Sequence, residues 1–166
     1  MFNVPARKKK DGFSLIELVV AMGVMMVLSA GVMSQIGSGS QKYGRDTRRK
    51  SDLSSVASSL EIYRNDNAGY PPCAPAGAGC EVNSASIPGL ANYLNSWPTD
   101  PLGATSRVYS YRPFDSGGGN CNGSASDRCV TYTLCTALEK VTTPVSATPA
   151  CRSCGTFTCS FRLTNP

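Results

Sequence analysis

Hydrophobic residues dominate one continuous stretch near the start of the chain. From Phe13 to Ile36 the only ionisable residue is Glu17. A helix rises ~1.5 Å per residue, so this stretch is long enough to cross a hydrocarbon layer ~30 Å thick. The pattern therefore predicts a membrane-inserted helix, which a short basic segment at residues 7–10 precedes.

A second, amphipathic helix is predicted from Arg48 onward. Leu53, Val56 and Leu60 follow the i, i+3, i+4 spacing, and serines fill most of the opposite side. The preceding "GSGSQKYG", residues 37–44, is a weak helical patch because each glycine costs ~1 kcal/mol relative to alanine. "RNDNAGYPP", residues 64–72, ends the helix with asparagines, a glycine and two prolines.

Alternating apolar and polar residues predict three antiparallel strands, arranged as a meander or nearly so. They lie at 107–113, 129–138 and 156–163. A long loop region precedes them, with one short helix in residues 87–97 and a proline-rich turn at 97–103. Packing the amphipathic helix on the one apolar face of the sheet gives an α+β unit with a small core.

The cysteine count indicates how that small core is stabilised. All eight cysteines follow the apolar stretch, which suggests disulfides in an oxidising compartment and leaves their pairing open. They are Cys73, Cys80, Cys121, Cys129, Cys135, Cys151, Cys154 and Cys159. The last four are also the donors of an alternative zinc site, but the chain lacks histidine and a second CxxC, so disulfides are favoured. A redox role for the CxxC segment is also disfavoured, because no βαβ pattern surrounds it.

The net charge of +5 owes much to the basic residues before Gly12. A second basic cluster, residues 42–50, follows the apolar stretch. Phosphate contacts to DNA or lipid are one interpretation of its segment "RDTRRK", residues 45–50, but a solvated helix face or subunit contacts are favoured, and no specific nucleic acid partner is predicted. With basic residues on both flanks, charge alone leaves the orientation open.

Glu17 distinguishes the apolar stretch from simpler membrane segments. A secretory signal peptide cut after Ala30 has no use for an acid at this position. An ordinary anchor helix also disfavours it, since ionisable residues inside spans are costly and usually functional. The acid therefore requires a partner.

The segment "KKKDGFSLIELV" resembles the processing site of type IV prepilins and type II secretion pseudopilins. The resemblance implies that a membrane peptidase cuts between Gly12 and Phe13 and methylates the new amino group. Glu17 then pairs with the amino terminus of a neighbouring subunit. A carboxylate and an amine brought together in lipid surroundings offset much of each other's desolvation cost.

The resemblance also implies a domain organisation. Residues 1–12 form a cleaved leader, residues 13–40 a transmembrane and polymerisation helix, and residues 41–166 an amphipathic helix with a globular head of the type IV pilin fold. Two further stretches, "EIYRNDNAGYP" and "YLNSWPTDPLG", look like parts of the pilins closest to the major secretion pseudopilin.

The function implied is that of a structural filament subunit. A pilus is preferred because the Gly- and Asp-rich calcium ending of major pseudopilins is not found; a secretion pseudopilin and a non-polymerising, membrane-anchored, cysteine-rich binding module are the alternatives. The implied partners are like subunits, the prepilin peptidase and methylase, and an assembly ATPase with its membrane platform. The subunit resides first in the cytoplasmic membrane, with residue 40 onward outside, and then in an extracellular filament.

Enzymatic activity and cofactors are not expected. The chain has no histidine, scattered acids and neither a G-x-S-x-G nor a phosphate-binding loop. The loop that carries Asp115, Asn120, Asn122 and Asp127 offers oxygens for calcium, but their spacing fits no EF-hand. A plain loop is favoured and no metal site is predicted.

Overall fold

The structure is a computed structural model that describes residues 12–35, 38–103, 107–145 and 151–165. The chain divides into two compact units, Met1–Ser40 and Gln41–Pro166, and each is described by itself. All but the last residue of the expected leader lies outside the described residues. The described chain therefore begins at Gly12.

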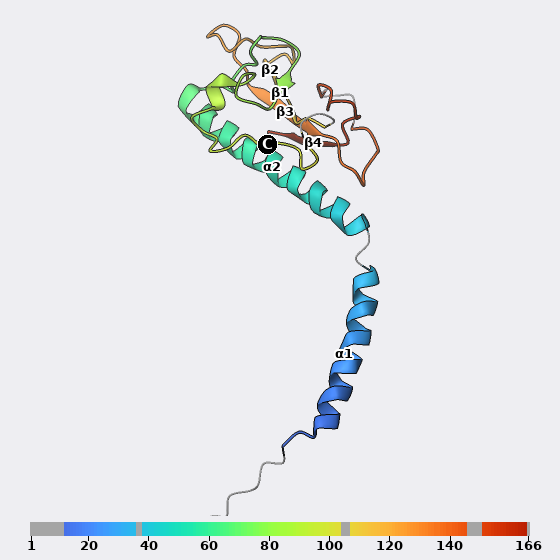
Figure 1. The fold of residues 1–166 in the computed structure, drawn as a ribbon. Coiled ribbons are helices and arrows are strands. Elements are labelled where there is room, and N and C mark those ends of the chain that lie inside the picture. Colours follow the sequence, from blue (N-terminus) through green and yellow to red (C-terminus); the bar gives the residue numbers. More distant parts are fainter. Residues whose placement is uncertain (1–11, 36–37, 104–106, 146–150, 166) are drawn as a thin grey trace, which may run out of the picture. The chain divides into compact units, whose positions relative to one another are not determined.

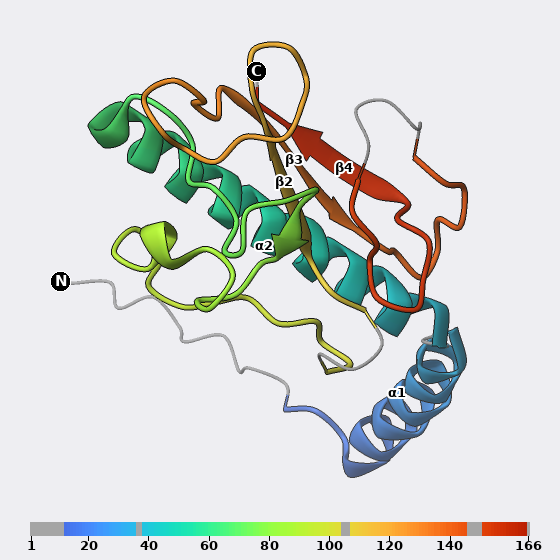
Figure 2. The ribbon, with the colours of Figure 1, turned by 90° about the horizontal axis from the view of Figure 1, so that it is seen from above.

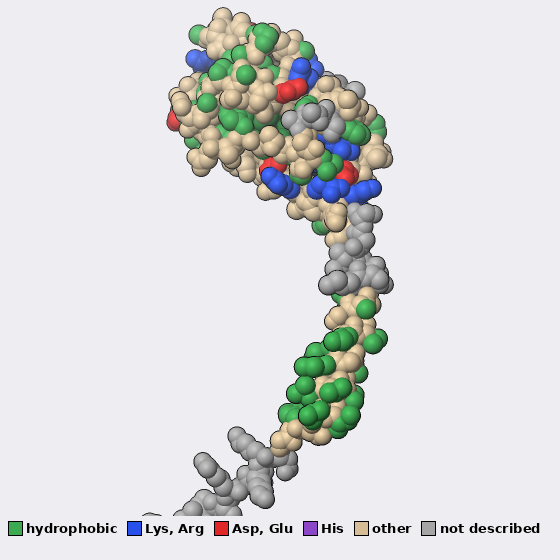
Figure 3. Space-filling view, viewed as in Figure 1, with side chains coloured by type: hydrophobic (Ala, Val, Ile, Leu, Met, Phe, Trp, Pro, Cys, Tyr) green, Lys and Arg blue, Asp and Glu red, His purple; other side chains and the backbone are tan. Residues whose placement is uncertain are grey.

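The first helix, α1 (Leu15–Gln35), is the apolar helix that the sequence predicts (Figure 1). Its window Leu15–Val32 has a mean hydropathy of 2.3, and none of it is buried. Length and composition alone make it the one helix of the described chain able to cross a membrane, a test that a signal sequence also passes. Figure 3 shows hydrophobic side chains along this helix.

The second helix, α2 (Ser38–Asn67), begins ten residues before the point where its amphipathic pattern becomes clear. Gly39 and Gly44 lie inside it. Their cost of ~1 kcal/mol each is outweighed because tertiary packing, rather than propensity, supplies most helix stability. Here that packing is provided by Asp46 and Arg49, which are both buried.

The helix ends inside the segment that the sequence marks for its end. Ala68 takes the left-handed conformation, with φ of 56°, in place of the neighbouring asparagines or Gly69. This conformation costs an L-residue ~1–2 kcal/mol. Tyr70 then donates its backbone N–H to the Cys129 carbonyl at 2.8 Å, which ties the helix exit to the chain before β3.

Four antiparallel strands form one sheet in the order β1-β2-β3-β4. They are β1 (Cys80–Glu81), β2 (Ser110–Phe114), β3 (Thr131–Thr136) and β4 (Phe161–Thr164). The three longer strands form the predicted meander, although each is shorter than expected. β1 lies outside the prediction because two residues are too few to show an alternation.

The main core lies between α2 and the sheet, which run side by side in both ribbon views (Figures 1 and 2). α2 contributes Leu53, Val56 and Leu60, each 0% exposed. The sheet contributes Tyr111 and Leu134, which face each other across β2 and β3. Burying each aliphatic side chain is worth ~1.5–3 kcal/mol, so the predicted α+β packing is confirmed.

The opposite face of the sheet is covered too, so the expectation of a single apolar face is wrong. Side chains alternate along a strand, and Cys135 therefore points away from its neighbour Leu134. Cys135 packs with Ala137, Cys154 and Cys159 in a second buried cluster. The residues after β3 fold back over this face. Disulfides, rather than helices or strands, hold these residues in place.

The loop region before β2 is less helical than predicted. Only Pro88–Leu90 form a single 3-10 turn, η1, in place of the short helix expected at 87–97. The predicted turn at 97–103 is present, because Gly103 donates its N–H to the Asp100 carbonyl at 2.9 Å. Gly103 has φ of 94°, a value that favours glycine. This turn carries Asp100 toward α2.

Candidate functional site

The residues assigned to processing and assembly lie together at the start of α1. Gly12 and Phe13 precede the helix, and Glu17 is in its first turn. The first helical hydrogen bond runs from the Leu18 N–H to the Ser14 carbonyl at 3.2 Å. Phe13 is 86% exposed, and nothing lies within 4 Å of the place where a Cβ on Gly12 would stand. The peptide bond between Gly12 and Phe13 is therefore accessible.

The surroundings of Glu17 stabilise its negative charge only in part. It lies near the positive end of α1, which stabilises an acid by ~0.3–1 kcal/mol. Glu17 lies four positions after Phe13, which is about one turn and ~6 Å along a helix. The exposed side chains around it are apolar, from Leu15 through Val32. Glu17 is thus the one ionisable side chain of α1.

The head unit contains a buried ionic cluster. Arg49 on α2 is 0% exposed and pairs with Asp100 at 2.5 Å, Asp46 at 2.7 Å and Glu139 at 2.8 Å. Arg45 joins the cluster through Glu139 at 2.6 Å. The three carboxylates come from α2, from the turn before β2 and from the segment after β3. One guanidinium thus ties together three parts of the head that are far apart in the sequence.

Each charge of the cluster faces an opposite charge. Hydrogen bonds from Arg45, and then from Arg49, lower the pKa of Glu139 to about 2 despite its burial. Burial by itself would lower the pKa of Arg49, but hydrogen bonds to Asp100, Glu139 and Asp46 raise it above its usual value. Asp46 also accepts the backbone N–H of Glu139 at 2.8 Å. The cluster is structural and fully partnered.

This cluster corrects the prediction that residues 45–50 form a solvated helix face or a surface for subunit contacts. That prediction is wrong for Asp46 and Arg49, which are buried, and for Arg45, which is partly buried. A signal was present in the sequence. Asp46 and Arg49 extend the spacing of Leu53 and Val56 backwards along α2, so they lie on the same face as the core residues.

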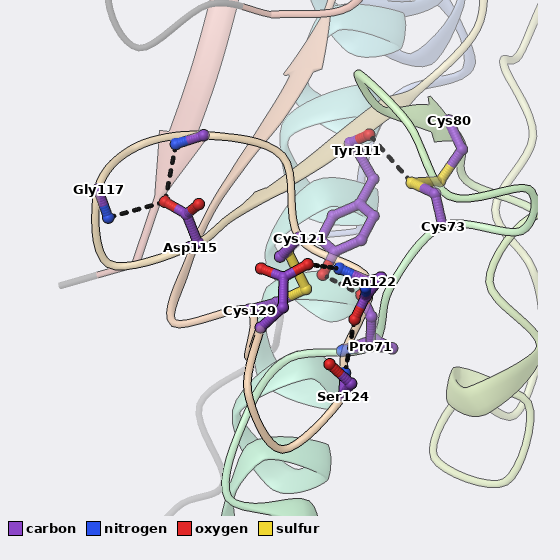
Figure 4. Close-up of a disulfide and its surroundings, with 12 residues drawn as sticks. Pro71, Cys73, Cys80, Tyr111, Asp115, Gly117, Cys121, Asn122, Ser124 and Cys129 are labelled. Atoms are coloured by element: carbon purple, nitrogen blue, oxygen red, sulfur yellow. Dashed lines mark hydrogen bonds between the residues drawn. A yellow bond between two sulfur atoms is a disulfide. The ribbon is translucent and has the colours of Figure 1, made fainter.

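All eight candidate cysteines are paired in the structure. Two of the bridges fasten the loops around the helix exit and the segment before β3 (Figure 4). The other two lie over the second face of the sheet. The bridges are Cys73–Cys80, Cys121–Cys129, Cys135–Cys151 and Cys154–Cys159.

The structure gives structural roles to the cysteines of the alternative zinc site. It does the same for the acids of the possible calcium loop. The four thiols are oxidised, and the two cysteines of the CxxC segment belong to different bridges. In the loop, Asp115 accepts the N–H groups of Gly117 and Gly119, and Asp127 accepts that of Asn122 (Figure 4). These carboxylates shape their own loops.

Comparison with known proteins places this geometry in a family. The family model described as the prokaryotic N-terminal methylation motif matches residues 7–33. The type II secretion system core protein G of Pseudomonas aeruginosa is 29% identical over 102 residues, which cover 58% of this chain and 71% of that protein. Proteins of the same name from Klebsiella michiganensis and Escherichia coli are 27% and 28% identical, over 63% and 59% of this chain and 76% and 70% of their own lengths. No solved structure matches the chain.

The motif includes Gly12, Phe13 and Glu17, and the matches to relatives extend well beyond it. The long apolar helix, the small antiparallel sheet and the four disulfides agree with the fold that the motif implies. The motif and the relatives together support the type IV pilin and type II secretion pseudopilin family for this chain.

Proposed function

We propose that this pilin-like protein is the structural subunit of a type IV pilus-like filament, cut by a prepilin peptidase between Gly12 and Phe13. The same peptidase methylates the new amino group of Phe13. An assembly ATPase and its membrane platform then move the subunit from the membrane into a filament of like subunits. The protein is membrane-anchored through α1 before assembly, with residues 41–166 outside, and extracellular afterwards.

The observation that carries the proposal is the single acid of α1. Glu17 lies one turn from the residue that processing would make the first, in a helix whose apolar side chains are exposed in the subunit. An apolar helix of this kind is stable in lipid or against copies of itself. Contacts between unlike surfaces of successive copies do not close, so they generate an open helical filament.

The pairing of opposite charges sets the axial offset between neighbouring subunits of that filament. A carboxylate in low-dielectric surroundings carries a desolvation cost of several kcal/mol, and an amine within a few Å offsets much of it. The amino group of Phe13 on one subunit and the carboxylate of Glu17 on the next are such a pair. Because the pair forms at one axial offset only, it selects the step between subunits.

The test of this pairing is Glu17→Gln, which removes the charge and keeps the shape. Since breaking a buried charge pair costs roughly 3–5 kcal/mol, filament yield should fall below about a tenth of the wild-type yield. Amino-terminal sequencing should still find Phe13 first, because the cut lies outside the pair. Ser29→Ala is the control, as the Ser29 hydroxyl donates to the Met25 carbonyl of its own helix.

A normal yield of filaments from the Glu17→Gln protein would contradict the pairing. An intact mass that retains residues 1–12, or that starts after Ala30, would contradict the processing. In that case the membrane-anchored binding module becomes the better description of the protein.

A secretion pseudopilin is the second candidate, and the names of the relatives favour it. The preference for a pilus rests on the carboxy-terminal region, where disulfides hold the chain in place of the calcium ending that the family resemblance attaches to major pseudopilins. Deleting the gene distinguishes the two. Loss of long surface fibres that contain this chain indicates a pilus, and loss of protein secretion without loss of fibres indicates a pseudopilus.

A further inference from the structure

The basic residues at the beginning of α2 fall into two classes. Arg45 and Arg49 are neutralised by the ionic cluster. Three others on the helix, Lys42, Arg48 and Lys50, are exposed. Lys140, from the segment after β3, joins them, since its amine lies 5.6 Å from the ring centroid of Tyr43. We define these four cations as the basic end of the head.

Among the described residues, none of these four cations forms an ion pair with a carboxylate. The carboxylates nearest to it in sequence, Asp46 and Glu139, are already bound to Arg45 and Arg49. Between Ser38 and Ser51, Asp46 is the only acid on α2. The next, Asp52, accepts the hydroxyl of Tyr109 at 2.7 Å. Lys and Arg side chains gather at this end of the head in Figure 3.

Chain connectivity limits where the basic end can go. Lys42 follows Val32, the last residue of the apolar window, by ten positions. Even a fully extended chain of that length spans at most ~36 Å, and a helical one ~15 Å. While α1 is in a membrane, chain length therefore keeps Lys42 within ~36 Å of the end of the apolar window in any orientation of the head.

The aromatic residue among these cations suits the same place. Tyr43 is 65% exposed, although its ring is large and apolar. Tyrosine is enriched at membrane interfaces, where its ring lies at the level of the headgroups. Clusters of Lys and Arg beside a membrane segment bind anionic headgroups by electrostatic attraction, which decays within a Debye length.

We propose that the basic end, Lys42, Arg48, Lys50 and Lys140, binds the phosphate groups of anionic phospholipids around α1 and holds the head of the unassembled subunit against the membrane. The inference rests on the membrane insertion of α1 that the proposed function includes, and it is independent of filament formation. Assembly would then have to break these contacts as the subunit leaves the lipid.

Lysine chemistry gives a direct test. After residue 12 the chain has three lysines, and all of them belong to the basic end. The processed full chain would be placed in nanodiscs of phosphatidylcholine, with or without a third of phosphatidylglycerol, and acetylated with a water-soluble reagent. Peptide mass spectrometry then gives the rate at each lysine.

Acetylation of Lys42, Lys50 and Lys140 should be at least about threefold slower in the anionic discs. Ionic strength of about 1 M, where the Debye length is about 3 Å, should restore the rates. Arg48→Gln should weaken the protection at all three lysines. Arg128→Gln, a matched loss of one exposed arginine from a loop of the head, should leave it unchanged.

Equal rates in both kinds of disc would overturn the proposal. The measurement uses the unassembled protein, so a failure of the filament proposal would leave its result unchanged. A chain that does not insert into the discs at all would instead contradict the membrane role of α1.

Discussion

Arg49 is a fully buried cation whose charge is offset by carboxylates from three separate segments of the head. Buried ion pairs of this kind contribute little net stability relative to apolar residues, because desolvation consumes the Coulomb gain. They are costly to break, however, because the remaining charges stay buried. The main effect of Arg49 is therefore to fix where the turn that carries Asp100 and the segment that carries Glu139 pack on α2.

Arg49→Leu should destabilise the head by about 3–5 kcal/mol, since it leaves three carboxylates close together without their main cation. Denaturant unfolding of the purified protein measures this. Arg48→Leu, one residue away and exposed, is the control and should change the free energy of unfolding by less than about 0.5 kcal/mol. Equal effects of the two substitutions would show that the ionic cluster does not support the fold.

Glu139 gives the head a defined acid sensitivity. Its pKa is about 2 in the folded protein and 4.5 for a free side chain, so it binds its proton more readily when unfolded. The stability it contributes is complete above pH 4.5 and is lost as the pH falls toward 2. Glu139→Gln should therefore lower stability at neutral pH and make the loss of stability between pH 4.5 and 2 less steep. A pH series of unfolding curves that is unchanged by the substitution would contradict this assignment.

At the level of helices and strands, the elements with a clear period could be predicted from the sequence. α1 and the core face of α2 follow directly from their hydrophobic spacing, and β2, β3 and β4 from alternation. The boundaries of α2 were harder to predict, because its start depends on a tertiary contact of Arg49 and its end on a left-handed Ala68. Neither is a property of local sequence.

Separation along the chain explains which parts of the sites could not be predicted from the sequence. Gly12, Phe13 and Glu17 are close in sequence, so a motif can identify them. The ionic cluster joins residues about 50 and 90 positions apart, as in Arg49 with Asp100 and Glu139, and a single sequence carries no record of such pairs. Cysteine pairing is open for the same reason, although here each bridge joins consecutive cysteines.

The two carboxy-terminal bridges should differ in their contribution to stability. Cys135–Cys151 closes a separation of 16 residues and Cys154–Cys159 one of 5. Chain entropy then assigns them about 3 and about 2 kcal/mol. Replacing each pair by alanines and measuring unfolding tests the order, and the two double variants serve as controls for each other, since each removes one fully buried cysteine. A larger loss from the shorter loop would contradict the entropic account.

At the scale of the whole molecule, the two units differ in how much of their apolar surface is buried. Both hydrophobic clusters of the described chain lie within the head. α1 buries nothing of its own window. The head has the size and the disulfides of an independent domain, whereas α1 leaves its apolar side chains exposed.

Residues 41–166, produced in an oxidising compartment, should therefore fold as a soluble monomer with the same four disulfides. Its unfolding midpoint should equal that of the head in the full chain held in detergent, because the core residues are all retained. Size-exclusion chromatography and peptide mapping of the bridges measure the outcome. A truncated chain that aggregates or scrambles its disulfides would show that α1 takes part in the fold of the head.

The position of Arg45 and Arg49 has a mechanical consequence under the filament proposal. A filament under tension is pulled through α1, so force enters each head where α2 begins. The ionic cluster lies ahead of the first core residue, Leu53, along that route. Part of the force thus passes through salt bridges to Asp100 and Glu139, and from there to the turn before β2 and the end of β3. The sheet shares the strain with α2 before the helix can be peeled from its hydrophobic face.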